Sequence, residues 1–202
     1  VSSFLRGKTV QSRLWTSAGM QPVHQANMAM QMRRSGDRLV VGRLYGDAPK
    51  SPGGLQIHHG QAPPKTLSTL RGVKTLDLVD LDGDGDDELL VADGWHYAYG
   101  EHGVARLIIF DGPDWRDSRP LAWMPEDYTI QGIEVAQGPH GSAILLTGSS
   151  GIYLVQLTPS GWTSMRIADR EGSGNAVFRH REGQWSVLVS GEPSREIPLE
   201  SR

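Results

Sequence analysis

Short apolar runs recur along the chain, and each follows a stretch in which apolar and polar residues alternate. The apolar runs occupy residues 38–42, 88–92, 143–147 and 185–189, and they begin 50, 55 and 42 residues apart. Alternation predicts a strand with one covered face, and a short apolar run between turn residues predicts a strand buried on both faces. We therefore expect one unit of consecutive β-strands to repeat along the chain.

Each apolar run has a candidate partner strand before it and another after it. The preceding strands are expected at residues 27–32, 73–79, 130–136 and 175–180. The following strands are expected at 54–58, 105–110, 151–157 and 195–199, with a fourth strand at 121–123 in the second unit and at 162–167 in the third. The repeat units then span about 21–70, 71–128, 129–172 and 173–202 of a single domain over residues 1–202. Helix content is expected to be minimal.

Repeats of this size favour one architecture. Units of about 40 to 55 residues with four strands are typical of β-propeller blades, whose faces are buried by stacking on neighbouring blades. The sequence therefore predicts an all-β fold, a β-propeller or propeller segment of about four four-stranded blades. Residues 1–20 hold a candidate closing strand, at 10–15, that would pair with the last unit and remove the open edges. Further blades on either side are the other interpretation, and a β-sandwich is the alternative fold.

Composition narrows the function classes. The chain has 202 residues, 25 glycines, 12 prolines and a formal net charge of −3. No block of basic residues predicts nucleic-acid binding, and no apolar run approaches the roughly 18 to 20 residues that span a bilayer, so membrane insertion is not expected. The sequence contains no cysteine, which excludes disulfides, thiolate metal ligands and a cysteine nucleophile.

The clearest chemical pattern is an acidic loop between two predicted strands, at residues 80–88. Its candidate ligands are the side chains of Asp80, Asp82, Asp84 and Glu88 and the backbone carbonyl of Asp86. Carboxylates packed this densely repel one another unless a cation neutralises them. Calcium fits because it accepts many oxygen ligands in flexible geometry, whereas magnesium demands a strict octahedron.

The acidic loop has two other interpretations. An EF-hand opens with the same acidic spacing but needs a glutamate at its twelfth position and a helix on each side. The twelfth position is Val91, inside a β-patterned run, so the EF-hand interpretation fails. An acidic hairpin turn without an ion is the structural alternative.

Residues 73–92, with the Asp-x-Asp-Gly-Asp-Gly loop between an alternating strand and a Leu-Leu-Val strand, resemble the FG-GAP or VCBS-type repeat of integrin α-chain propellers and bacterial secreted proteins. The resemblance implies that Asp80, Asp82, Asp84 and Glu88 bind calcium through side chains and Asp86 through its carbonyl. Glu88 stands where aspartate is commoner in that family. The equivalent loops of the other units lack the acidic pattern, so one calcium ion is expected, with a structural role.

A second candidate site is the loop that follows the 88–92 strand. Its aromatic and imidazole side chains are Trp95, His96, Tyr97, Tyr99 and His102. Exposed aromatic rings beside polar groups suit sugar or peptide recognition. The alternative is that Trp95 and Tyr97 pack against a neighbouring unit. Because successive loops of a meander alternate ends, this loop and the acidic loop are expected at opposite ends of one sheet.

These features predict a calcium-stabilised recognition or adhesion module for a glycan or protein, located outside the cell, at its surface or in the periplasm, where millimolar calcium fills weak sites. No motif predicts catalysis, and a non-catalytic role is favoured. A polysaccharide lyase or hydrolase is the alternative, for which Asp111, Asp114, Glu126 and Asp127 are candidate carboxylates. A structural subunit that assembles with other chains or further blades is the third hypothesis.

Overall fold

The structure is a computed structural model, and its fold is built from β-strands. It describes residues 2–6, 9–16, 19–22, 29–45, 52–60, 62–67, 72–94, 103–112, 114–138, 141–158, 160–169, 175–190 and 193–199. Every regular element in these ranges is a β-strand, which confirms the all-β prediction. The same ranges contain no helix long and apolar enough to cross a membrane.

The strands form antiparallel sheets, and each sheet takes its strands in chain order. The first sheet holds β1 (Ser2–Arg6), β2 (Thr9–Thr16) and β3 (Gly19–Pro22). The second holds β4 (Ala29–Ser35), β5 (Arg38–Tyr45), β6 (Pro52–His59) and β7 (Lys65–Leu67). The third holds β8 (Val73–Val79), β9 (Glu88–Asp93), β10 (Val104–Asp111) and β11 (Asp117–Glu126). The fourth holds β12 (Ile130–Gly138), β13 (Gly141–Gly148), β14 (Gly151–Thr158) and β15 (Gly161–Asp169). The fifth holds β16 (Ala176–Arg181), β17 (Gln184–Val189) and β18 (Arg195–Pro198).

Sheets two to five lie within the four expected repeat units. Their second strands, β5, β9, β13 and β17, contain the four apolar runs. The short β7 is the strand that the hydrophobic pattern missed, because only three residues pair with β6. Residues 27 and 28 of the expected first strand lie outside the described residues, and β4 begins at Ala29.

The predicted closing strand does not pair with the last unit. In the described part of the chain, β2 pairs with β1 and β3, and β18 pairs with β17 alone. The N-terminal strands thus form a sheet from local hairpins instead of closing a ring. Local pairing closes a much shorter loop than pairing with a strand almost 200 residues away, and it therefore loses less chain entropy.

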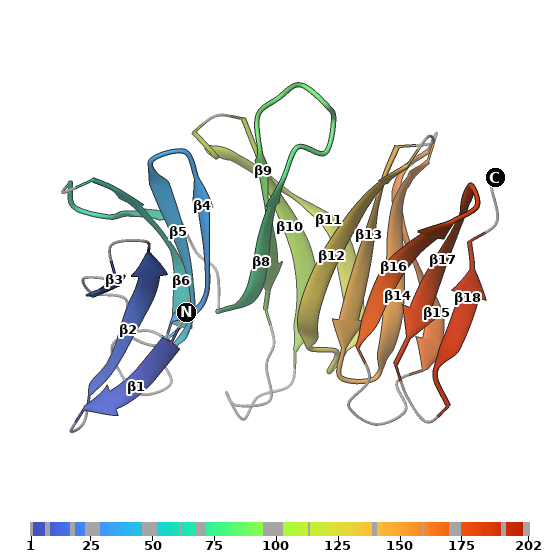
Figure 1. The fold of residues 1–202 in the computed structure, drawn as a ribbon, viewed down its shortest axis with the longest axis horizontal. Coiled ribbons are helices and arrows are strands. Elements are labelled where there is room, and N and C mark those ends of the chain that lie inside the picture. Colours follow the sequence, from blue (N-terminus) through green and yellow to red (C-terminus); the bar gives the residue numbers. More distant parts are fainter. Residues whose placement is uncertain are drawn as a thin grey trace.

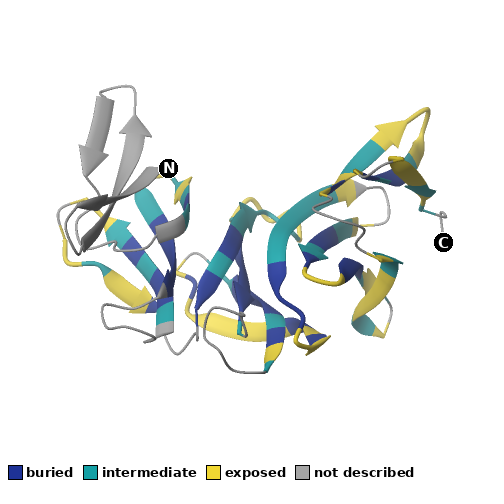
Figure 2. Cartoon of the chain, turned by 90° about the horizontal axis from the view of Figure 1, so that it is seen from below, coloured by how far each residue is buried: buried dark blue, intermediate teal, exposed yellow. Residues whose placement is uncertain are grey.

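The sheets follow one another in space as they do in sequence (Figure 1). From the second sheet to the fifth, the first strands of successive sheets are neighbours, because β4 contacts β8, β8 contacts β12, and β12 contacts β16. Figure 2 shows the buried residues concentrated where neighbouring sheets face each other, and exposed residues along outer strands and turns. The hydrophobic core is therefore a series of layers between sheets.

The burial of β9 explains why its sequence is apolar throughout. All six of its residues are buried. Leu89 and Val91 pack in the layer shared with the second sheet, and Leu90 and Ala92 pack in the layer shared with the fourth. Successive side chains of a strand point to opposite faces, so a strand covered on both faces shows no alternation of apolar and polar residues.

Candidate metal site

The acidic loop connects β8 to β9 and projects from one end of the third sheet (Figure 1). Two glycines let its backbone turn. Gly83 has a φ of 82° and Gly85 a φ of 94°, in the region that residues with a Cβ rarely adopt. A Cβ at either position would meet no other atom, so the requirement for glycine comes from backbone conformation and not from space.

Backbone N–H groups of the loop hold its carboxylates in place. Asp80 accepts hydrogen bonds from Gly83 N at 2.7 Å and from Gly85 N at 3.0 Å, one on each carboxylate oxygen. Asp82 Oδ1 accepts from Asp84 N at 3.2 Å. Asp84 Oδ1 accepts from Asp86 N at 2.8 Å. The loop is thus wound around its own acidic side chains, which places negative oxygens on its concave side.

Glu88 closes the base of the loop. It is the first residue of β9, only 5% exposed, and its Oε2 accepts a hydrogen bond from Leu81 N at 2.6 Å. Oxygen atoms of Asp80, Asp82 and Glu88 all lie within 4.8 Å of one another. These three carboxylates could together hold one metal ion, because each offers an oxygen to a common centre.

The carboxylates of this loop act on one another electrostatically. Burial raises the pKa of the Glu88 carboxyl above its ordinary value, and the Leu81 N–H partly opposes that rise. The carboxylates of Asp82, Asp84 and Asp111 raise it further. Among the described residues, none of the loop's candidate ligands forms an ion pair with a lysine, arginine or histidine. A bound cation would remove this repulsion.

The structure groups three of the four predicted carboxylate ligands. Asp84 lies outside the group defined by Asp80, Asp82 and Glu88, and the backbone carbonyl predicted for Asp86 stays a prediction. Asp84 Oδ1 instead accepts a hydrogen bond from Asp86 N, and both residues are exposed. Three of the four predicted carboxylates therefore lie close enough together to hold one ion.

Side chains from the two neighbouring sheets contact the loop, and the sequence did not indicate them. From the second sheet, Ser35 Oγ donates to Asp87 Oδ2 at 3.1 Å. From the fourth sheet, Gln137 Nε2 donates to the Asp80 carbonyl, and Ser142 Oγ donates to the Leu81 carbonyl at 2.8 Å. The loop is therefore held from both sides by hydrogen bonds to its backbone and to Asp87. Gln137 and Ser142 lie in the β12–β13 hairpin, which corresponds in the fourth sheet to the acidic loop of the third. This correspondence is the sequence signal that could have indicated them.

The second candidate site falls outside the described residues. This applies to Trp95, His96, Tyr97, Tyr99 and His102 alike. The structure does describe the residues that flank this loop, Asp93 and Gly94 before it and Gly103 after it. They lie at the end of the third sheet opposite the acidic loop, as the meander requires.

The four candidate carboxylates for glycoside hydrolysis fall into two groups at opposite ends of β11. Asp111 and Asp114 lie at the β10–β11 connection, whereas Glu126 and Asp127 lie at the far end of the ten-residue β11. A strand of that length separates its ends by about 30 Å, well beyond the roughly 5 to 10 Å between paired carboxyl groups of glycosidases. Asp111 and Asp114 instead form ion pairs with Arg119 and Arg116.

Comparison with known proteins adds no family to these observations. No protein-family model matches the chain, and no curated protein matches it.

Proposed function

We propose that this chain is a calcium-stabilised β-propeller segment that serves as a recognition module outside the cytosol. The observation that carries the proposal is the convergence of Asp80, Asp82 and Glu88 oxygens within 4.8 Å on a loop wound by its own backbone N–H groups. A site built only of oxygen ligands suits a hard cation. Calcium is favoured over magnesium because a loop of this kind offers many carboxylate and carbonyl oxygens without strict geometry.

The propeller part of the proposal is supported by how the sheets stack. Each sheet is a meander of consecutive antiparallel strands, and from the second sheet to the fifth the first strand of each sheet contacts the first strand of the next. Propeller blades have this order, with their first strands nearest the axis. The resemblance of residues 73–92 to the FG-GAP or VCBS-type repeat points the same way.

The bound ion would stabilise the folded state. With millimolar calcium and a dissociation constant of about 10⁻⁴ M, binding to the folded state contributes about 1 to 2 kcal/mol. Sites of this strength fill at extracellular calcium concentrations, which supports a location outside the cell, at its surface or in the periplasm.

The proposed partner is a glycan or a protein. Recognition is preferred over hydrolysis because the candidate catalytic carboxylates lie at opposite ends of β11.

Calcium titration by calorimetry tests the proposal. The protein is stripped with a chelator, and calcium binding is compared between wild type and Asp82→Asn. The asparagine keeps an oxygen that can accept the Asp84 N–H but removes the charge. We expect one calcium ion per wild-type chain and at least about tenfold weaker binding by the variant.

Asp169→Asn is the matched control, because Asp169 is an exposed aspartate on the outer strand of the fourth sheet. Its calcium affinity should equal that of wild type. Absence of calcium binding by wild type at several millimolar would overturn the proposal and leave an acidic hairpin. Equal loss in both variants would show that general surface charge, and not the loop, attracts the ion.

A further inference from the structure

The second strands of sheets two to five share one position on the face that is turned away from the preceding sheet. It comes just before the residue that pairs with the first residue of β4, β8, β12 or β16. The residues at this position are Gly42, Ala92, Thr147 and Leu188. Two places earlier, Val40, Leu90 and Leu145 pack in the layer shared with the next sheet. Alternate residues of a strand share a face, so the position faces the next sheet wherever there is one.

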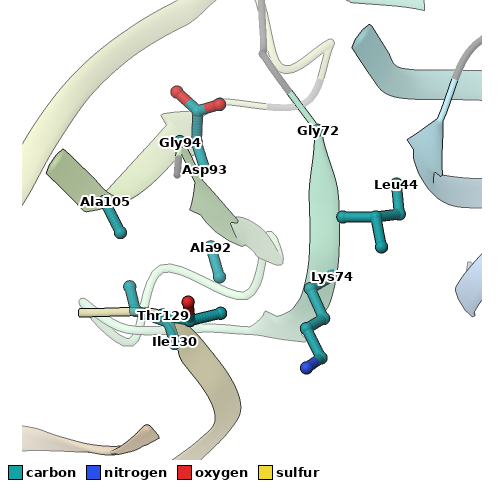
Figure 3. A pocket seen from close by; sticks show the side chains of 9 residues that line it. All are labelled: Leu44, Gly72, Lys74, Ala92, Asp93, Gly94, Ala105, Thr129 and Ile130. Atoms are coloured by element: carbon teal, nitrogen blue, oxygen red, sulfur yellow. The ribbon is translucent and has the colours of Figure 1, made fainter. Parts of the chain in front are cut away.

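The next sheet comes close to this position in the second and third sheets. A Cβ added to Gly42 would lie 2.7 Å from a side-chain carbon of Val73, on the first strand of the third sheet. Ala92 lines a small recess together with Thr129 and Ile130, at the start of the fourth sheet (Figure 3). Protein interiors are close-packed, so a larger side chain at either place would push the next sheet away. Small residues here make room for the next sheet.

The fifth sheet departs from this rule. Its residue at the position is Leu188, which is half-buried and pairs with Val177, itself 44% exposed. Val187 and Val189 pack in the layer shared with the fourth sheet, so Leu188 and its partner lie on the opposite face. A leucine would occupy the space that a next sheet takes in the other units. This face therefore does not suit a further sheet packed as the others are, and it presents an apolar pair to another kind of contact.

The charges around this apolar pair are balanced. Arg179 and Glu196 lie on the same face and form an ion pair at 3.1 Å, and Glu196 also accepts a hydrogen bond from Ser186 Oγ at 2.6 Å. Toward the turn, Arg181 forms an ion pair with Glu182 at 3.4 Å. Each arginine of the face is thus matched by a glutamate. Two such faces can approach each other without a net repulsion between like charges.

We propose that this face is a homodimer interface, in which the fifth sheets of two copies pack face to face about a two-fold axis along β17. β17 is the central strand of its sheet, so it would lie on β17 of the second copy, and β16 would lie on β18 of the second copy. Leu188 then packs on Leu188 of the second copy. Arg179 faces the strand that carries Glu196 of the second copy, which makes the charges complementary across the interface. Identical twisted sheets can pack in this aligned way.

The dimer is expected to be weak and reversible. Three strands about 4.8 Å apart, with about six residues each, offer a face of roughly 15 by 20 Å. Contacts of this size belong to the small, transient class of interfaces, and we expect a dissociation constant of about 10⁻⁴ M. Neither Val177 nor Leu188 belongs to the candidate metal site. The inference therefore goes beyond the proposed recognition function and does not depend on it.

Sedimentation velocity on the full chain in millimolar calcium tests the dimer. Wild type should be mostly monomeric at about 5 µM and mostly dimeric at about 500 µM, as the expected dissociation constant requires. Val177→Glu should weaken the dimer about tenfold or more, because the new carboxylate faces β18 of the second copy, which carries Glu196. Val177→Lys, opposite the same glutamate, should weaken it less. Leu157→Glu is the control, since Leu157 is 57% exposed on the fourth sheet and should leave the dimer unchanged.

A monomeric wild type at about 500 µM would overturn the proposal, as would a dimer that Val177→Glu leaves intact. Assemblies larger than a dimer would also overturn it, because they require a head-to-tail contact. At about 5 µM, Val177→Glu should melt at the temperature of wild type, which separates loss of the interface from loss of folding.

Cross-linking gives a second readout that does not depend on that variant. The chain contains no cysteine, so Leu188→Cys carries a single thiol. Backbones of packed sheets lie about 10 Å apart, too far for a disulfide, and a short bismaleimide is the suitable reagent. At about 200 µM, Leu188→Cys should form a covalent dimer at least about five times faster than Leu157→Cys, although Leu157 is the more exposed residue. Equal rates would indicate random collision and overturn the two-fold contact along β17.

Discussion

At the scale of single residues, Trp115 fixes the acidic loop to the core beneath it. The side chain is fully buried, and its Nε1–H donates to the Asp87 carbonyl at 2.8 Å. The Arg38 guanidinium lies 4.3 Å from the centre of the ring. One residue from the β10–β11 connection therefore holds the last residue of the acidic loop and carries a cation–π contact from the second sheet.

Replacing Trp115 with phenylalanine should destabilise the fold. The change removes the hydrogen bond to Asp87 and leaves a gap in a packed core, and we expect a loss of about 2 to 4 kcal/mol in the free energy of unfolding. Urea denaturation measures it. Trp123→Phe is the matched control, because that exposed tryptophan should tolerate the same change within about 0.5 kcal/mol. Equal losses in the two variants would contradict the role given to Trp115.

At the scale of elements, the acidic loop and its neighbouring hairpins form one connected unit. Ser35 is the last residue of β4, and Ser142 lies on β13, yet both form hydrogen bonds with the loop between β8 and β9. Binding of a cation should order the loop and so strengthen these contacts between sheets. By thermodynamic reciprocity, the contacts should strengthen binding of the cation by the same factor.

Ser142→Ala should therefore weaken calcium binding although Ser142 touches no predicted ligand side chain. We expect a loss of about two- to tenfold in affinity, the equivalent of one hydrogen bond. Calorimetry under the conditions of the wild-type titration measures it. Ser160→Ala removes the hydroxyl of a serine in the β14–β15 turn and should leave the affinity unchanged. An unchanged affinity in Ser142→Ala would show that the loop binds independently of the fourth sheet.

A second contact between elements depends on pH. Glu134 on β12 accepts a hydrogen bond from Phe178 N on β16 at 3.2 Å, which links the fourth and fifth sheets. Burial raises the pKa of the Glu134 carboxyl above its ordinary value of 4.5, and this hydrogen bond partly opposes the rise. Between the ordinary and the raised pKa, the folded state binds the proton more tightly than the unfolded state. The contribution of Glu134 to stability therefore falls as pH rises through that window.

Glu134→Gln keeps an oxygen for the Phe178 N–H and cannot ionise. Relative to wild type, this variant should be more stable at pH 7 than it is at pH 4, because only wild type carries a partly buried charge at pH 7. Thermal unfolding at the two pH values measures the difference. Glu126→Gln, at an exposed glutamate on β11, should show a smaller dependence on pH. A pH-independent difference for Glu134→Gln would contradict the raised pKa.

At the scale of the whole molecule, stability depends on how successive sheets cover one another. Three buried clusters join the second to the third sheet, the third to the fourth, and the fourth to the fifth. The acidic loop lies at the junction of the second, third and fourth sheets and contacts both neighbours of its own sheet. An ion bound there would stabilise the stack and not one hairpin alone.

Removal of calcium should lower the melting temperature of the full chain. A binding contribution of about 1 to 2 kcal/mol corresponds to a decrease of roughly 2 to 8 °C for a chain of this size. Differential scanning calorimetry with calcium, with a chelator, and with magnesium at equal concentration measures it. Magnesium should give the smaller stabilisation. Equal effects of the two ions would indicate a loosely bound counterion instead of a coordinated calcium.

The sequence by itself determined the positions of the strands from β4 to β18, apart from the short β7, and the identity of the acidic loop. These features are local. Alternating side chains reveal which face of a strand is covered, and the glycines and aspartates of residues 80–88 specify a turn that can be recognised without its surroundings.

Only the tertiary structure decided which residues meet. It placed the carboxylates of Asp80, Asp82 and Glu88 together and left that of Asp84 outside the group. It also brought Ser35, Gln137 and Ser142 to the loop, and aligned Asp93, Arg106 and Trp123 across three strands. Such contacts depend on strand register and on the stacking of sheets, which join residues 13 to 61 positions apart in the chain. The physical reason is that a hydrophobic pattern records whether a side chain is covered, but not which side chain covers it.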